Sequence, residues 1–343
     1  MGAGNVAARH ARVLSGFPDV RIAGVADTDA ARAARLAREY GAASYGSHTA
    51  LLRDERLDAV YVCVPPFAHG PIELAVLDAG LSLFVEKPLA LDEGTARRVA
   101  ATARRTGAVT AVGHHWRYMD VVDEARRRLG DRPVRLALGM WLDKVPPVPW
   151  WPRLDGSGGQ VVEQAVHVLD LARLLVGEVA EVSAHESGHP PEQAEGAAGP
   201  GGAGGAAGKD GTAGIGGADG TAGRVGAATG ALLRFRDGAA GILGATCLLS
   251  WKHRAGLEIY AEGLALRISE DRMVVDSDRG REVVTESGDA RRRVDRAFVD
   301  AVLHRGEDVR APYEDALRTH RLACAVARAA ASGVPVTLDD DEG

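Results

Sequence analysis

A glutamate and a lysine follow an apolar run and precede a proline, in the order Phe84-Val85-Glu86-Lys87-Pro88. The apolar run is typical of a buried strand, and ligands of open α/β sheets bind at the carboxyl ends of such strands. A lysine at that position can hold a substrate oxygen and stabilise negative charge that develops on it. The alternative is an ordinary surface ion pair at the end of a strand.

A second cluster of polar residues lies in an otherwise apolar segment that follows Gly158-Gly159. On a helix, Glu163, His167 and Asp170 have the spacing i, i+4, i+7 and therefore share one face. A carboxylate beside an imidazole can orient the ring and bring its pKa towards neutrality, as a proton-transferring group requires. A core histidine whose hydrogen bonds are satisfied is the alternative.

The first residues fit the pattern G-x-G-x-x-A, whose glycines let a pyrophosphate approach the N-terminus of the next helix. Asp27 follows after about 20 residues, where a carboxylate accepts hydrogen bonds from ribose hydroxyls. It would also repel a 2′-phosphate, which favours NAD over NADP. The alternative is that Asp27 only caps a helix starting near Asp29. The residues assigned to the phosphate turn are Gly2, Gly4, Asn5 and Val6.

In the doubly wound fold a strand precedes this turn, and that strand lies centrally in the sheet order 3-2-1-4-5-6. Here only Met1 precedes the glycines. We therefore expect the natural chain to begin about six to ten residues upstream, with an apolar strand.

Strand-like and helix-like segments alternate over the first third of the chain, which predicts parallel βαβ units. From Val134 onward, strand-like segments follow one another, interrupted by a helical segment at 160–175 and closed by two helices. We thus expect an α/β dinucleotide-binding domain at 1–118 and an α+β domain with an open, mostly antiparallel sheet at 119–343. The expected strands are 20–26, 59–64, 82–85, 108–112, 135–141, 179–185, 230–235, 239–249, 257–261 and 264–269.

Glycine is concentrated in one segment, because 15 of the 43 glycines lie between residues 196 and 230. This stretch has almost no large apolar residues and cannot bury enough surface to offset the entropy of ordering it. We therefore predict a disordered insertion at about 194–229, within the second domain.

Composition excludes several classes of protein. The net charge is −6 and the basic residues are scattered, which argues against a nucleic-acid partner. Three cysteines are too few and too distant for a disulfide framework or a cysteine-rich metal site, and we expect no bound metal. No apolar run is long enough to span a membrane, and no signal peptide is recognisable. We expect a cytoplasmic protein.

Two adjacent tryptophans, Trp150 and Trp151, lie in a proline-rich segment just before the Gly158-Gly159 pair. Indole faces suit the apolar faces of a sugar or cyclitol ring, so both residues are candidates for substrate binding. Alternatively, they cover the core between the domains.

Together these motifs resemble those of the Gfo/Idh/MocA family of NAD(P)-dependent oxidoreductases, over nearly the whole chain apart from the glycine-rich segment. The markers are GAGNVAARH at 2–10, VCVPPFAH at 62–69, FVEKPLAL at 84–91, GHHWRY at 113–118, GGQVVEQAVHVLDL at 158–171 and the segment 296–325. The resemblance implies a Rossmann domain followed by the α+β domain.

The resemblance also implies roles for individual residues. Lys87 would bind the reacting hydroxyl and assist proton transfer, and His167 would be the general acid/base. Glu163 stands where the family usually has aspartate; its longer side chain would bind substrate or orient His167. The remaining expected contacts to cofactor or substrate are Pro65, Pro66 and His69 near the nicotinamide ribose, Glu86 beside the nicotinamide, and Arg117 at a substrate hydroxyl or the cofactor.

The resulting hypothesis is hydride transfer between nicotinamide and a carbinol or keto carbon of a sugar, inositol or related polyol. NAD-dependent glycoside cleavage or elimination without net redox change is one alternative. A non-catalytic cofactor-sensing protein on the same fold is another. The resemblance further implies a homo-dimer or homo-tetramer assembled through the open sheet.

Overall fold

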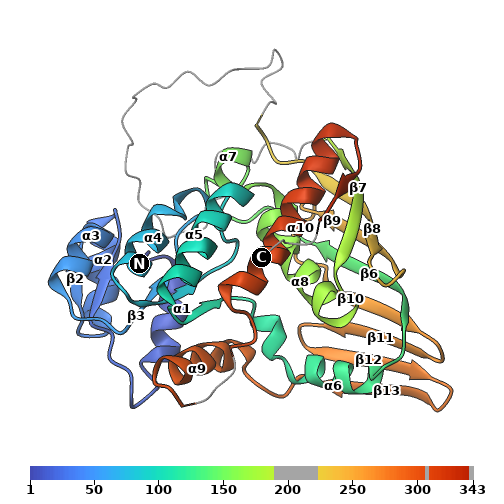
Figure 1. The fold of residues 1–343 in the computed structure, drawn as a ribbon, viewed down its shortest axis with the longest axis horizontal. Helices are drawn as coiled ribbons and strands as arrows, with labels where there is room; N and C mark the ends of the chain where they lie inside the picture. Colours follow the sequence, from blue (N-terminus) through green and yellow to red (C-terminus); the bar gives the residue numbers. More distant parts are fainter. Residues whose placement is uncertain (189–222, 306–308, 340–343) are drawn as a thin grey trace.

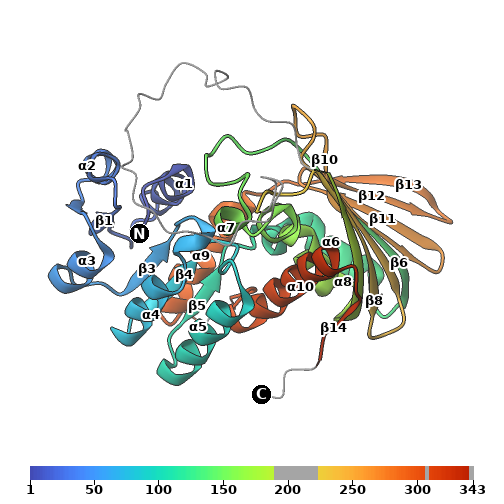
Figure 2. The same cartoon turned by 90° about the horizontal axis from the view of Figure 1, so that it is seen from above.

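The computed structural model describes residues 1–188, 223–305 and 309–339 (Figure 1). Two groups of elements are visible: short parallel strands with helices at the N-terminal side, and one large sheet at the C-terminal side. The large sheet carries helices on one of its faces (Figure 2). This is the Rossmann domain with a second, open-sheet domain that the motifs predict.

The N-terminal strands form two separate parallel sheets, β1-β2 and β3-β4-β5. Alternating helices connect them, as expected for βαβ units. The bounds are α1 Asn5–Leu14, β1 Gly24–Ala26, α2 Ala30–Glu39, β2 Ala43–Tyr45, α3 His48–Asp54, β3 Ala59–Val62, α4 Pro71–Asp78, β4 Ser82–Val85, α5 Glu93–Thr106 and β5 Thr110–Val112.

Met1 and Gly2 lie between β1 and β3 and touch both. The Met1 ammonium donates to the Tyr61 carbonyl at 2.6 Å, the Cys63 amide donates to the Met1 carbonyl at 2.8 Å, and the Gly2 amide donates to the Ala26 carbonyl at 2.8 Å. Met1 and Gly2 thus lie where the central strand of the sheet is expected. Residues upstream of Met1 stay a prediction.

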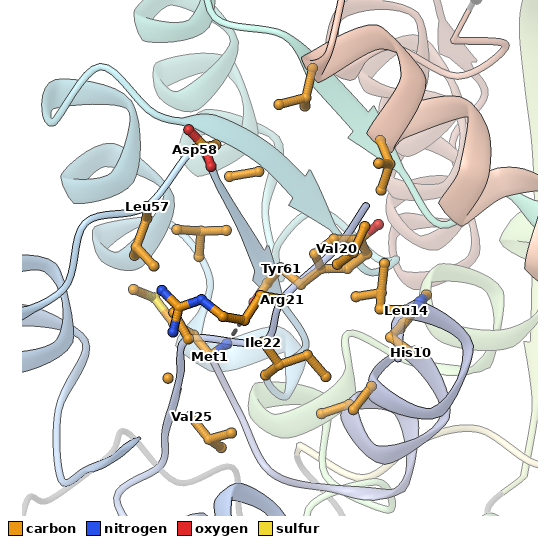
Figure 3. Close-up of a pocket in the computed structure, with 18 of the residues that line it drawn as sticks. Met1, His10, Leu14, Val20, Arg21, Ile22, Val25, Leu57, Asp58 and Tyr61 are labelled. Atoms are coloured by element: carbon orange, nitrogen blue, oxygen red, sulfur yellow. Dashed lines mark hydrogen bonds between the residues drawn. The ribbon is translucent and has the colours of Figure 1, made fainter. Parts of the chain in front are cut away.

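Next to Met1, a cavity of about 350 Å³ separates the two small sheets (Figure 3). Its walls are mostly apolar side chains from α1, β1, β3 and α9. Burial lowers the pKa of the Met1 ammonium, because little water reaches it. Labelled residues in the close-up include Leu14, Ile22, Val25 and Tyr61.

The C-terminal sheet has the strand order β13-β12-β11-β10-β6-β9-β8-β7-β14. Among the strand pairs of the described residues in this sheet, β6-β9 alone is parallel, so the open sheet is mostly antiparallel, as predicted. The bounds are α6 Asp120–Leu129, β6 Val134–Leu142, α7 Leu154–Ser157, α8 Val166–Leu175, β7 Val179–Ser187, β8 Ala228–Phe235, β9 Ala240–Thr246, β10 Arg254–Ala261, β11 Leu264–Ser269, β12 Arg272–Ser277, β13 Gly280–Thr285, α9 Ala290–Val302, α10 Tyr313–Ser332 and β14 Val336–Thr337.

One face of this sheet forms the core with α8 and α10. The helix α8 approaches β6 closely, since a Cβ at Gly139 would lie 2.7 Å from the Val168 side chain. On the other face, Leu232 of β8 and its cross-strand partner Ile242 of β9 are 61% and 46% exposed. Within the described chain, no helix lies over that face (Figure 2).

The last helix returns to the N-terminal half. Tyr313, Ala316 and Leu317 of α10 are buried in the same core as Val60 of β3 and Val85 of β4. The backbone also connects the two, because the Val112 amide of β5 donates to the Ala311 carbonyl at 2.9 Å. The boundary between two domains after residue 118 therefore stays a prediction. In the structure, helix α10 of the C-terminal half packs in the core of the N-terminal half.

The expected strand at 20–26 is shorter in the structure, since β1 begins only at Gly24. Residues 20–23 of this run lie outside the strand. Residues 194–222 of the expected insertion lie outside the described residues, and β8 already begins at Ala228. None of the described helices is long and apolar enough to cross a membrane.

Candidate active site

Lys87 and Glu163 form an ion pair that connects the two halves of the molecule. Lys87 comes just after β4, and Glu163 lies in the π-helical turn Val161–Ala165 before α8. The Lys87 Nζ donates to the Glu163 Oε1 at 3.0 Å and to the Glu163 backbone carbonyl at 2.7 Å. Both side chains are 16% exposed, so the pair is shielded but reachable. Turns with π geometry disturb the regular ladder and are frequent at functional sites.

His167 packs beside two indole rings that also stack on each other, with 5.9 Å between the indole centroids. Its ring stacks on Trp116 and Trp141 with centroid distances of 5.7 and 5.8 Å and interplanar angles of 20° and 25°. Burial lowers its pKa well below the ordinary value, and the nearby positive charge of Lys87 adds to the effect. His167 is therefore a neutral imidazole at physiological pH, as a proton acceptor must be.

Glu163 and His167 share a helix face but make no mutual hydrogen bond among those the structure records. The Glu163 carboxylate is used instead by Lys87 and by the Trp151 indole, whose Nε1 donates to Oε2 at 2.8 Å. The buried Nδ1 of His167 has no protein partner in the described chain. The expectation that Glu163 orients the imidazole is thus not supported; its geometry fits orientation of Lys87.

Arg117 was expected to reach a substrate hydroxyl or the cofactor, but it is only 4% exposed and is fully engaged by protein. Its Nε and Nη2 donate to the Asp170 carboxylate at 2.8 and 2.5 Å, and its Nη1 donates to the Arg310 carbonyl. A further ion pair joins it to Asp315. Arg117 and Asp170 therefore connect α8 to the segment around the start of α10.

Burial would raise the pKa of Asp170, but His114 and Arg117 outweigh it and hold that pKa below the ordinary range. Asp170 is consequently ionised and paired with Arg117. No hydrogen bond between Asp170 and His167 is recorded in the described chain, although the two lie within one turn of the same helix.

The glycine turn is open where a phosphate would bind. A Cβ at Gly4 meets nothing within 4 Å, and the first turn of α1 has no side-chain cap and no acidic residue. Asn5 and Val6 are exposed beside it. Unpaired amides at a helix N-terminus attract anions, so this turn fits a pyrophosphate.

The backbone at position 2 requires a glycine. The φ of Gly2 is +85°, and a Cβ there would lie 2.3 Å from the Cys63 carbonyl oxygen. The Asp27 carboxylate lies next to the turn, because it accepts the Ala3 amide at 2.7 Å and the Asp29 amide at 2.8 Å. Asp29, not Asp27, is the residue that caps α2. The residues present therefore fit a dinucleotide, with Asp27 near enough to the turn to meet a ribose.

Glu86 belongs to a buried network that the motifs did not predict. His10 of α1 bonds to the Glu86 Oε1 at 2.8 Å through Nε2 and to the Asp295 Oδ1 of α9 at 2.7 Å through Nδ1. Burial lowers the pKa of His10, but the two carboxylates overcome this and raise it to about 9. Glu86 and His10 each lie in a motif, but Asp295 comes from a distant helix and carries no such signal, so the network was not predictable.

The residues of the proline loop after β3 differ in how far they are buried. Pro65 is half-buried, Pro66 is buried in the 3-10 turn Pro66–Ala68, and His69 is buried with its Nδ1 2.5 Å from the Glu73 Oε1. The Nε2 of His69 has no recorded partner, but the side chain is fully buried, so the expected contact with a nicotinamide ribose would need the ring to become accessible. Pro65 and Pro66 have no such constraint.

The two tryptophans differ. Trp151 is 0% exposed and packs on Val225 and Cys247, so its indole face is not available to a sugar in this structure. Trp150 is half-buried and stays a candidate for substrate contact. The alternative expectation, that these residues cover the core, fits Trp151. In the described residues, no group of histidine, cysteine and carboxylate side chains is placed to bind a metal ion.

The fold and the site together define a protein with a dinucleotide-binding half and an open-sheet half whose polar groups meet at their junction. Two family models match: an oxidoreductase family with an NAD-binding Rossmann fold at residues 1–114, and the GFO/IDH/MocA C-terminal domain at residues 128–267. The chain belongs to the Gfo/Idh/MocA family.

Among curated proteins, the chain is similar to scyllo-inositol 2-dehydrogenase (NAD(+)) of Bacillus subtilis, with 28% identity over 54% of this chain and 55% of the relative. It is also similar to D-glucoside 3-dehydrogenase of Escherichia coli, with 32% identity over 54% and 56%. The chain spans about half the length of these curated relatives. A solved levoglucosan dehydrogenase in complex with NADH and levoglucosan shares the fold, with a TM-score of 0.81, 18% identity and coverage of 99% and 98%.

Proposed function

We propose that this chain is an NAD-dependent oxidoreductase that transfers hydride between nicotinamide and a carbinol carbon of a sugar, inositol or related polyol. The observation that carries the proposal is the Lys87 ammonium held by Glu163 at the junction of the two halves, near the neutral imidazole of His167. Relatives named as inositol and glucoside dehydrogenases support the substrate class.

The residues act as follows. Asp27 and the open glycine turn hold the ribose and pyrophosphate of the dinucleotide, and NAD supplies the hydride acceptor when bound. Lys87 donates a hydrogen bond to the substrate oxygen and stabilises negative charge on it. His167 takes the hydroxyl proton as the hydride leaves the carbon, and returns it in the reverse direction. Glu163 fixes Lys87 in place.

The same geometry favours NAD over NADP. Asp27 is ionisable, lies beside the glycine turn and uses its two oxygens on backbone amides. A 2′-phosphate at the adjacent ribose would meet this negative charge, whereas a hydroxyl can donate to it. We expect NADP to support less turnover than NAD at equal concentration.

Replacing Lys87 tests the proposal. In Lys87→Ala we expect the rate of NADH formation from the best polyol to fall by at least about 10²-fold, because a hydrogen-bond donor at the developing charge is lost. NAD affinity, measured by titration calorimetry, is expected to stay within about twofold. A variant with a near-normal rate would contradict the role of Lys87, and polyol consumption without NADH accumulation would indicate cleavage or elimination instead.

We also propose that the chain forms homo-oligomers through the open face of the large sheet. Leu232 and Ile242 form an exposed apolar pair on that face, and neighbouring apolar side chains left exposed support an interaction site there. A second copy presents the same surface, which suits a two-fold interface.

A further inference from the structure

The Glu163 carboxylate has one partner for each oxygen. Oε1 accepts from the Lys87 Nζ at 3.0 Å, and Oε2 accepts from the Trp151 Nε1 at 2.8 Å. A glutamate side chain has one more rotatable bond than aspartate, so a carboxylate held at one oxygen alone would sample several positions. The second bond removes that freedom.

Trp151 is well suited to hold a carboxylate. Its indole only donates, it is fully buried, and it packs on Val225 and Cys247 in a small cluster beside the site. A hydrogen bond from a buried donor to an ionised acceptor is stronger than one between neutral groups. Its neighbour Trp150 is half-buried and makes no recorded hydrogen bond to Glu163, so the two tryptophans can be compared directly.

Lys87 depends on Glu163 twice, because it donates to both the side chain and the backbone carbonyl of that residue. An ammonium has three donors, and the two recorded bonds leave one donor for a ligand oxygen. The direction of that third donor is therefore set by the position of Glu163.

We propose that Trp151 is a positioning residue that acts through Glu163: its indole N–H fixes the carboxylate, and the carboxylate aims the free donor of Lys87 at the substrate oxygen. This inference rests on the proposed function for the identity of the ligand. It assigns Trp151 a role in aligning the lysine, which differs from both sugar stacking and covering the core, the two roles that its sequence position leaves open.

Chemical labelling of lysine tests the inference without a substrate. The full chain is treated with an amine-reactive reagent, and the labelling rate of each lysine is measured by mass spectrometry. The variant Trp151→Phe keeps an aromatic ring but removes the N–H. We expect Lys87 to react at least about twofold faster in it, because the Glu163 carboxylate that holds Lys87 has lost its bond to the indole. Lys144 and Lys252 are internal controls whose rates stay unchanged, and Trp150→Phe is the matched variant that leaves Lys87 unchanged.

A double-mutant cycle shows whether Trp151 acts through Glu163. We expect the single variant Glu163→Ala to raise the labelling rate of Lys87. Adding Trp151→Phe to Glu163→Ala should not change that rate further. Equal effects of Trp151→Phe with and without Glu163 would overturn the inference, as would unchanged Lys87 labelling in the single variant. Thermal unfolding of each variant shows that the fold is retained.

The kinetic arm uses myo-inositol and NAD with the same variants. For Trp151→Phe we expect kcat to fall roughly tenfold to a hundredfold with KM for NAD changed less than about twofold, because a misaligned group slows chemistry more than cofactor binding. If the unmodified chain forms NADH from no polyol, the proposed function fails, while the labelling arm still decides whether Trp151 positions Lys87.

Discussion

The burial of His167 beside Trp116 and Trp141 has a consequence for the dependence of activity on pH. Burial is the main cause that lowers its pKa, followed by the positive charge of Lys87. A lowered pKa means that the imidazole stays unprotonated as the pH falls through 6.5, the ordinary histidine value. The base form therefore persists at acidic pH, where an exposed histidine would already be charged.

We therefore expect the acid limb of kcat/KM, which reports the free enzyme, to lie below pH 6.5. In Trp141→Leu, which opens one side of the imidazole, burial is reduced and the limb should move towards 6.5. The measurement is the rate of NADH formation across pH 5 to 8, at about constant ionic strength, for the parent and this variant. A limb at or above 6.5 in the parent would contradict the buried neutral state of His167.

At the scale of elements, the two glycines of the turn before α1 have different roles: Gly2 is needed for the backbone conformation, and Gly4 leaves room for a ligand. Gly2 needs its glycine because of its positive φ and the Cys63 carbonyl, whereas the space above Gly4 is empty. We expect Gly4→Ala to leave the melting temperature unchanged and to weaken NAD binding by about tenfold, since the methyl occupies the approach of the pyrophosphate. Calorimetric titration with NAD and thermal unfolding measure the two effects.

Gly2→Ala is the matched variant, and there we expect a lower melting temperature in addition to weaker binding. If Gly4→Ala bound NAD as tightly as the parent, the phosphate turn would be assigned incorrectly.

The exposed face of the large sheet gives a second prediction at this scale. We expect Ile242→Glu to lower the molar mass in light scattering to that of a monomer, because it places a charge in the apolar centre of the proposed interface. Val334→Glu, at another exposed apolar position after α10, serves as the control and leaves the mass unchanged. A parent chain that is already monomeric at micromolar concentration would contradict the proposed assembly.

At the scale of the whole molecule, the cavity between β1 and β3 predicts where stability can be gained. We expect an extension of about five β-branched apolar residues before Met1 to pair with both strands and raise the free energy of unfolding by more than about 2 kcal/mol. The extension also replaces the buried Met1 ammonium by a peptide amide, which removes a charge from the interior.

An extension of the same length made of glycine and serine is the control for chain length. Chemical denaturation of the two variants and the parent gives the comparison. Equal stability of the two extended chains would show that the cavity does not accept a strand.

Much of this architecture is predictable from sequence because local patterns carry it. The apolar run before Glu86 and the glycine pattern before α1 predict β4 and the phosphate turn, and the strand succession after Val134 predicts the open sheet. The strands β12 and β13 escape prediction because each is short and mixes two charged residues with few apolar ones; β13 lies at the edge of the sheet and β12 next to it.

The candidate site shows the same limit. Residue types and spacing identify Lys87, Glu163 and His167 as candidates. Which of them pair with each other depends on contacts between segments that are distant in the sequence. Sequence spacing favours a Glu163–His167 pair, while the structure gives Glu163 to Lys87 and Trp151. Arg117 and His10 are likewise engaged by Asp170 and Asp295, which lie 53 and 285 positions away.

The central claim is hydride transfer from a carbinol carbon to NAD, and isotope transfer measures it most directly. The full chain is incubated with NAD and a panel of inositols and sugars, and each polyol that yields NADH is then supplied with deuterium on its ring carbons. We predict that mass spectrometry finds one deuterium in the reduced nicotinamide, and that Lys87→Ala abolishes its appearance. Absence of reduced cofactor with every polyol, or reduced cofactor without deuterium, would contradict the account.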